Sequence, residues 1–106
     1  MTDIALVYAL FPDEASARNA ARTVVSERLA ACANLLAPCT SFYEWGGEMT
    51  EASEIPALFK TTATGAEALI ARIAELHSYE VPAILSWAAG AAHPPFAQWV
   101  HDQTRK

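Results

Sequence analysis

Residues 32–62 read CANLLAPCTSFYEWGGEMTEASEIPALFKTT, and this stretch decides the fold. The Gly46-Gly47 pair near its middle accepts the positive φ angles that a two-residue hairpin turn requires. The residues on both sides include many of the β-branched and aromatic types that favour strands. A two-residue turn places Trp45 opposite Glu48 and thereby fixes the pairing along the hairpin. We therefore predict two long antiparallel strands joined at the glycine pair.

Two prolines interrupt this hairpin at the same level. The register set by the turn places Pro38 opposite Ile55, so that Pro38 and Pro56 fall close together. Each proline removes a backbone donor from the ladder. We predict a bend or bulge there, which divides the hairpin into an inner half within the sheet and a projecting tip. A two-stranded tip is only marginally stable alone, so we expect a neighbouring subunit to support it.

The flanking segments supply two helices and two further strands. Residues 4–10 form an apolar run typical of a strand covered on both faces. Asp13 is the expected N-cap of an amphipathic helix. Thr64-Gly-Ala-Glu67 has the spacing of a capping box at the start of a second helix. Residues 82–89 indicate another apolar strand, and a short helix is expected after residue 95.

This order of elements predicts an α+β fold. Strand, helix, strand, strand, helix, strand form a ferredoxin-like βαββαβ sandwich, here with a long bent hairpin and a short C-terminal helix. With 106 residues, 53% of them hydrophobic, the chain has room for a single domain over residues 1–106. The apolar content is high for this length, and burial between subunits is its simplest outlet.

Charge and composition exclude several classes of partner. The net charge is −5 and the basic residues are scattered, which argues against nucleic acid and against anionic membrane surfaces. No segment approaches the roughly 20 apolar residues of a membrane-spanning helix, and no signal peptide is visible. If Cys32 and Cys39 share an extended strand, roughly 23 Å separates them, which is too far for a disulfide. Reduced thiols indicate a cytoplasmic protein.

Four stretches together resemble the signature of the CutA family of divalent-cation tolerance proteins. They are Leu29-Ala-Ala-Cys-Ala-Asn34, Ser41-Phe-Tyr-Glu-Trp-Gly-Gly47, Lys60-Thr61-Thr62 and His77-Ser-Tyr-Glu-Val-Pro82. The resemblance covers nearly the whole chain. It implies a ferredoxin-like fold, a homotrimer built through long hairpins, tolerance of copper and other divalent cations, and no enzymatic activity. It also implies a likeness to the trimeric PII signalling proteins.

The resemblance points to His77 as the main metal candidate, because histidines before the tyrosine have been implicated in copper binding in the family. Two other implicated places hold Ala9 and Leu76 in this chain. Imidazole is a good ligand for copper and zinc, and Glu80 could add an oxygen donor. A structural role at the end of the second helix explains His77 equally well.

The two cysteines are further metal candidates. Donors from several subunits, such as Cys32 and His77 meeting across an interface, could complete a shell that one chain lacks. Cys32 is more often a small buried hydrophobe. Cys39 lies beside the predicted bend and could be more exposed, which would leave it open to a metal.

A second group of residues is expected at a cleft or subunit interface. Ser41, Tyr43 and Trp45 share one face of their strand, and aromatic side chains are common in interface cores. Tyr79 would shape the cleft. Lys60 could neutralise an anionic effector, snorkel, or pair with the nearby Glu54.

Two other functions compete with metal binding. A PII-like sensor of a small anion or nucleotide would use Lys60, Ser41 and the aromatic residues, with metal binding secondary. A Cys–His hydrolase would need Cys32 or Cys39 beside His77, with Asn34 as an orienting group. No nucleophile elbow or phosphate loop supports an enzyme, so we expect a binding protein.

Overall fold

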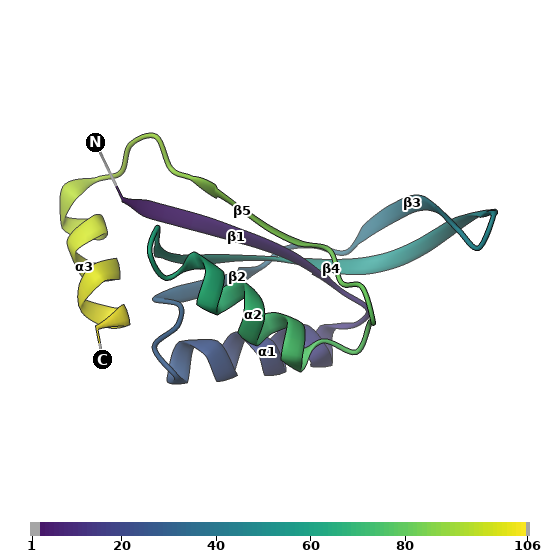
Figure 1. Ribbon diagram of the computed structural model, residues 1–106, viewed down its shortest axis with the longest axis horizontal. Helices are drawn as coiled ribbons and strands as arrows, with labels where there is room; N and C mark the ends of the chain where they lie inside the picture. The colour runs from purple at the N-terminus through teal and green to yellow at the C-terminus, as the bar shows by residue number, and fades with distance from the viewer. Residues whose placement is uncertain (1–2, 106) are drawn as a thin grey trace.

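The computed structural model describes residues 3–105 and confirms the ferredoxin-like α+β fold. The elements are β1 (Ile4–Phe11), α1 (Glu14–Ser26), β2 (Cys32–Leu35), β3 (Cys39–Trp45), β4 (Glu48–Thr62), α2 (Ala66–Leu76), β5 (Ile84–Ala88) and α3 (Pro94–Thr104). The antiparallel sheet has the order β2-β4-β1-β5, and β3 continues the pairing along β4. In Figure 1, α1 and α2 lie side by side along the sheet, and the β3–β4 hairpin projects at one end.

The core lies between the sheet and the two helices. Every second residue of β1, from Ala5 to Phe11, is buried there, together with Phe59 of β4. Val24 of α1 and Ile73 of α2 pack against them. Burial of each large apolar side chain stabilises the fold by about 1.5–3 kcal/mol, so this layer holds the helices on one face of the sheet.

One of the two predicted helix starts is confirmed. Asp13 caps α1, because its Oδ1 accepts the backbone N–H of Ser16 at 2.8 Å. The predicted capping box at Thr64-Gly-Ala-Glu67 is wrong, because Gly65 is the N-cap of α2 and no side chain caps it. The helix begins one residue later than the box requires, and Thr62 Oγ1 accepts the Gly65 N–H at 3.1 Å instead.

The hairpin has the predicted turn and the predicted interruption. Trp45 pairs with Glu48, and both turn glycines have positive φ angles. The pairing runs regularly to Cys39 opposite Glu54, then resumes with Leu35 opposite Ala57. Three residues on one strand thus face two on the other, which is a one-residue bulge. The bulge reverses the alternation of the strand, so that odd-numbered residues face the helices in β2 but face away from them in β3.

Because of this reversal, the odd-numbered residues of β3 lie on the face of the sheet that α1 and α2 do not cover. We call this face the open face. In β4, the even-numbered residues lie on the open face along the whole strand, because only its partner strand is bulged. The projecting part, residues 39–54, is called the arm. Ser41, Tyr43 and Trp45 of the arm therefore share a surface with Glu54 and with Leu10 of β1.

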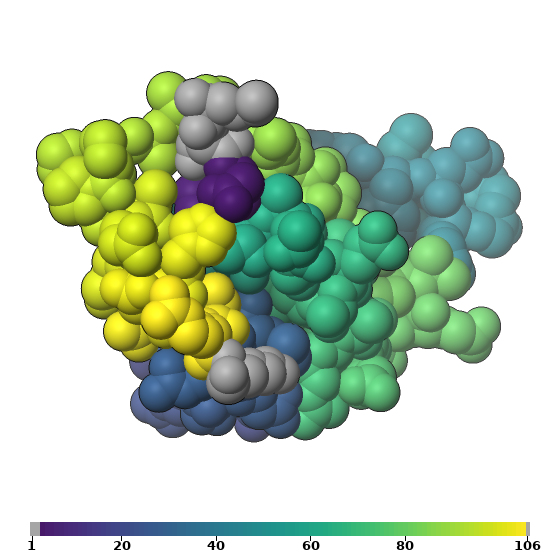
Figure 2. Space-filling view, turned by 60° about the vertical axis from the view of Figure 1, so that its left-hand side comes forward, coloured from purple at the N-terminus to yellow at the C-terminus, as the bar shows by residue number. Residues whose placement is uncertain are grey.

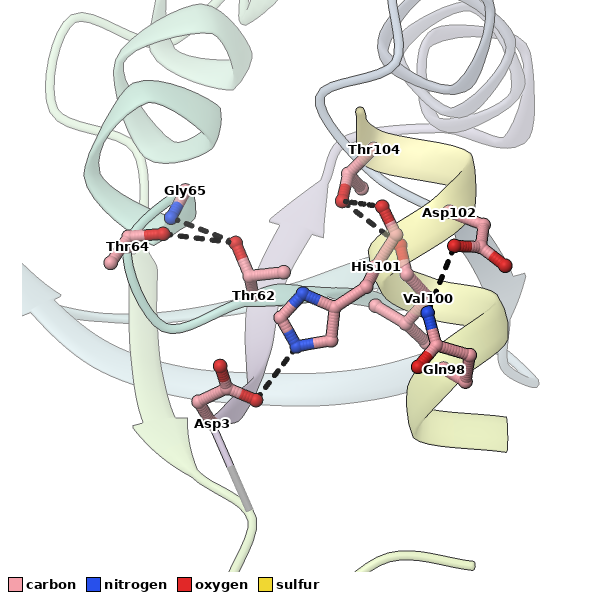
Figure 3. A network of polar contacts seen from close by, with 9 residues as sticks. All are labelled: Asp3, Thr62, Thr64, Gly65, Gln98, Val100, His101, Asp102 and Thr104. Atoms are coloured by element: carbon pink, nitrogen blue, oxygen red, sulfur yellow. Dashed lines mark hydrogen bonds and ion pairs between the residues drawn. The ribbon is translucent and has the colours of Figure 1, made fainter. Parts of the chain in front are cut away.

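The C-terminal helix closes the opposite end of the body from the arm. Val100 of α3 is buried with Ile4 and Ala31, and Figure 2 shows the helix against the start of β1 and the turn after α1. His101 Nε2 lies 2.8 Å from Asp3 Oδ1. Figure 3 draws this contact between α3 and the residue before β1. Within residues 3–105, no helix has the length and apolar character needed to cross a membrane.

Candidate functional site

A cavity of about 690 Å³ opens where the arm leaves the body. Residues of β1, the arm and the segment after α2 line it: Leu10, Ser41, Phe42, Tyr43, Trp45, Thr50, Glu54, Tyr79, Glu80, Val81 and Ala83. The structure thus brings together five of the predicted site residues, namely Ser41, Tyr43, Trp45, Tyr79 and Glu80. The other four, Cys32, Cys39, Lys60 and His77, are not among the residues that line the cavity.

Glu54 is the functional candidate that sequence reasoning missed. Its side chain is only 5% exposed, and its Oε2 accepts a hydrogen bond from the Tyr79 hydroxyl at 3.2 Å. Burial raises the pKa of Tyr79, and the Glu54 carboxylate adds to this rise because it opposes a second negative charge beside it. The available signal was the hairpin register, which places Glu54 opposite Cys39 on the surface shared with Tyr43.

Of the alternatives left open for Lys60, the ion pair with Glu54 is not formed among the described residues. Lys60 Nζ donates to Asn34 Oδ1 on the neighbouring strand β2. Both residues lie on the open face, further along the sheet than the cavity. Since Lys60 is directed to Asn34, it does not supply a positive charge to the cavity.

His77 anchors the segment that forms one wall of the cavity. Its Nε2 lies 2.6 Å from the Leu10 carbonyl oxygen, and its Nδ1 accepts the Tyr79 backbone N–H at 3.1 Å. A carbonyl only accepts and an N–H only donates, so the ring is neutral with its proton on Nε2. The ring also stacks on Phe11, with centroids 5.0 Å apart. In this arrangement neither nitrogen has a free lone pair, so metal binding at His77 requires the loss of one hydrogen bond.

The donors of one chain do not fit a copper or zinc ion. Within residues 3–105, no three side chains of the His, Cys, Asp or Glu type are grouped closely enough to hold a metal. Such ions usually take three or four protein ligands. Cys32 and Cys39 are both half-buried free thiols, and Cys39 Sγ lies 3.9 Å from Ser41 Oγ.

The hydrolase alternative gains no support from the geometry. The hydrogen bonds of His77 go to the backbone of Leu10 and Tyr79, and those of the described residues include none between this ring and a cysteine. Asn34, the proposed orienting group, contacts Lys60.

The cavity is unsuited to an anion, because its charged lining residues are the carboxylates Glu54 and Glu80.

Comparisons with known proteins identify what the chain is similar to. The family model described as CutA1 divalent ion tolerance protein matches residues 5–103. A divalent-cation tolerance protein CutA from Pyrococcus horikoshii is 40% identical over 101 residues, which cover 95% of this chain and 98% of that protein. The mouse protein CutA is 37% identical over 101 residues, and the match covers 95% of this chain but only 57% of the mouse protein.

Solved structures share the same architecture. The crystal structure of CutA from Xylella fastidiosa matches with a TM-score of 0.95 and 33% identity, covering 98% of this chain and 100% of that chain. CutA1 from a psychrotrophic Shewanella matches with a TM-score of 0.94 and 26% identity, covering 99% and 98%.

Proposed function

This chain belongs to the CutA1 family of divalent ion tolerance proteins, and on that premise we propose that it acts as a homotrimer that binds divalent cations. The proposed role is binding and not catalysis, and the proposed location is the cytoplasm. The observation that carries the proposal is the uncovered apolar surface of the arm and of strand β5.

Large apolar side chains are exposed along the arm and along β5. Trp45 and Met49 at the arm tip are 66% and 76% exposed, and Leu85 and Trp87 on β5 are 51% and 46% exposed. Extended apolar surfaces of this kind mark interaction sites in soluble proteins. Strand β5 is also a sheet edge, and its sequence ILSWA has no lysine or proline to prevent pairing with another chain.

The shape of the chain favours a closed assembly of copies. The chain extends 46 Å along its longest axis but only 26 and 22 Å along the others, because the arm projects from the body. A two-stranded arm is marginal alone, and contact with the body of a neighbouring copy would support it. When the arm of one copy contacts the body of the next, the contact is head-to-tail, and such contacts form a ring when the rotation between copies closes. Three is the number of copies that the family resemblance implies.

The proposed cation is copper or zinc, bound where subunits meet. Since the described residues of one chain hold no complete donor set, the proposed site lies between subunits, where donors from two chains would combine. Glu80 is exposed and lines the cavity, so its carboxylate is available. His77 is the less available candidate, because its Nδ1 would have to release the Tyr79 N–H. Cys32 and Cys39 stay secondary candidates.

Light scattering and calorimetry test the two parts of the proposal separately. The purified protein should have three times the mass of one chain, and a stable monomer at high concentration would contradict the trimer. Titration with copper or zinc should show saturable binding that Glu80→Gln weakens. Glu67→Gln on the exposed side of α2 is the matched control, since it removes the same charge far from the arm. Equal weakening by both variants would exclude Glu80 as a ligand.

A further inference from the structure

The surfaces at the two ends of the body differ, as a head-to-tail assembly requires. The cavity lies where the arm leaves the body, and α3 closes the opposite end (Figure 1). A head-to-tail contact joins two different surfaces of the same chain. In the proposed trimer, the cavity of one copy therefore faces a surface of the next copy that is not the cavity itself. The α3 end supplies a surface of the right kind.

Helix α3 carries an aromatic pair that is partly exposed to solvent. Val100 of this helix is fully buried, whereas Phe96 and Trp99 are 36% and 41% exposed. The two rings stack on each other with their centroids 6.0 Å apart. Residues three positions apart are neighbours on a helix surface, so the two rings form one projecting patch. Phe and Trp side chains are enriched in the cores of protein interfaces.

The lining of the cavity suits aromatic side chains from a second copy. Its apolar members are Leu10, Phe42, Tyr43, Trp45, Val81 and Ala83. An aromatic side chain buries about 150–250 Å² in such surroundings and gains further from edge-to-face contacts with other rings. Sites of about 300–1,000 Å³ enclose drug-sized molecules, so a volume of about 690 Å³ accommodates two aromatic side chains. These rings would also cover Val81, which is 70% exposed in the single chain.

The charges at the two ends are complementary. The arm has no lysine or arginine and carries four glutamates, which are Glu44, Glu48, Glu51 and Glu54. Residues 89–106 contain two basic residues and two histidines but only one acidic residue. Arg28 lies at the same end, where its Nη1 donates to the Gln103 carbonyl at 3.1 Å. Opposite charges favour contact between the arm end and the α3 end, and like charges disfavour contact between two arms.

From these features we propose that Phe96 and Trp99 of one copy fill the cavity beside the arm of the next copy. This inference rests on the proposed function, because it names the two surfaces through which the homotrimer closes. Each copy supplies one cavity and one aromatic pair, so every cavity in a closed ring is filled. The exposed Leu85 and Trp87 of β5 fit the cavity less well, because their strand has no basic residue to meet the glutamates of the arm.

Photo-cross-linking of the purified protein tests the proposal. The photoreactive amino acid p-benzoylphenylalanine is placed at Trp99 in one variant and at Phe96 in a second, since it keeps an aromatic ring at either position. After illumination, mass spectrometry of the covalent dimer should show links to residues 41–54 or 79–83. Gln98 is the matched control position, because it is exposed on α3 but lies about 100° around the helix from Trp99. It should give no link to these segments.

Alanine variants give a second readout. Trp99→Ala should weaken assembly about tenfold or more in a dilution series followed by light scattering, and Gln98→Ala should leave assembly unchanged. Cross-links from Trp99 and Phe96 to β5 alone, or equal effects of the two alanine variants, would overturn the proposal while the trimer stands. A wild-type protein that is monomeric in the same light-scattering experiment would instead contradict the trimer, and this inference with it.

Discussion

Replacement of His77 by alanine should destabilise the protein in the absence of any metal. The ring makes hydrogen bonds at 2.6 Å to the Leu10 carbonyl and at 3.1 Å from the Tyr79 N–H. Each contributes about 1 kcal/mol net. The ring contacts with Phe11 and Tyr79, at centroid distances of 5.0 and 4.8 Å, add about 0.5 kcal/mol or more each. We therefore expect a loss of about 3 kcal/mol in the free energy of unfolding.

Two further substitutions separate the contributions of the two hydrogen bonds to this loss of stability. His77→Gln keeps a donor near the position of Nε2, and His77→Asn keeps an acceptor near the position of Nδ1. Each should recover about 1 kcal/mol relative to His77→Ala. His101→Ala is the control, because that histidine lies on the exposed side of α3 and should cost less.

Urea unfolding, followed by circular dichroism at one fixed protein concentration in a chelating buffer, measures these differences. A loss of about 3 kcal/mol corresponds to a midpoint shift of about 1.5 M urea. If His77→Ala unfolds at the same urea concentration as the wild type, the ring does not anchor the segment after α2. If the variant is less stable only when copper or zinc is added, His77 is a metal ligand and the structural assignment is wrong.

Three other residues give independent tests. Arg28 has a φ of 63° after the end of α1, a conformation in which glycine is favoured. Arg28→Gly should therefore stabilise the fold by about 1 kcal/mol in thermal unfolding. The loss of the hydrogen bond from Arg28 to the Gln103 carbonyl should offset part of this gain. Arg28→Lys should show no gain. The pKa of Asp13 is lowered by the hydrogen bonds from Ser16 at the start of α1. The Asp13 carboxylate therefore stabilises the folded state above the usual carboxyl range, and this contribution is lost as the pH falls. In unfolding curves taken from pH 3 to 6, the stability of Asp13→Asn should depend less on pH than that of the wild type. The pKa of Tyr79 is raised by burial, so its stabilisation is present below pH 10 and is lost at higher pH, and ultraviolet titration should show a late-ionising tyrosine that Tyr79→Phe removes.

The sequence predicted most of the fold because period-two alternation and turn chemistry act locally. Gly46-Gly47 and the flanking strand residues sufficed for the register of the arm, and the two prolines sufficed for the position of the bulge. Element ends were less certain. Strand β5 begins at Ile84 and not at Pro82. Helix α2 begins one residue later than its expected capping box, because Thr62 Oγ1 accepts the Gly65 N–H.

The site was harder to predict because it depends on which residues meet across elements. Tyr79 and Glu54 are 25 positions apart, and no spacing rule indicates that the segment after α2 turns back onto the arm. Lys60 could be paired with Glu54 on paper, yet they lie at different levels of β4, and Asn34 on the adjacent strand is nearer to Lys60. The hydrogen bond between His77 Nε2 and the Leu10 carbonyl likewise joins two residues that are distant in sequence.

The bulge between β2 and β3 has a consequence for how this protein can change over evolution. Substitutions in the arm alter one side chain of the cavity at a time. Deletion of a single residue between Leu35 and Cys39 would leave two residues facing two and would remove the bulge, while the glycine turn would keep Ser41, Tyr43 and Trp45 paired with the even-numbered residues of β4. The length of this short connection thus sets the bend between the body and the arm, and relatives that lack the extra residue should present the same side chains on an arm that leaves the sheet in a different direction.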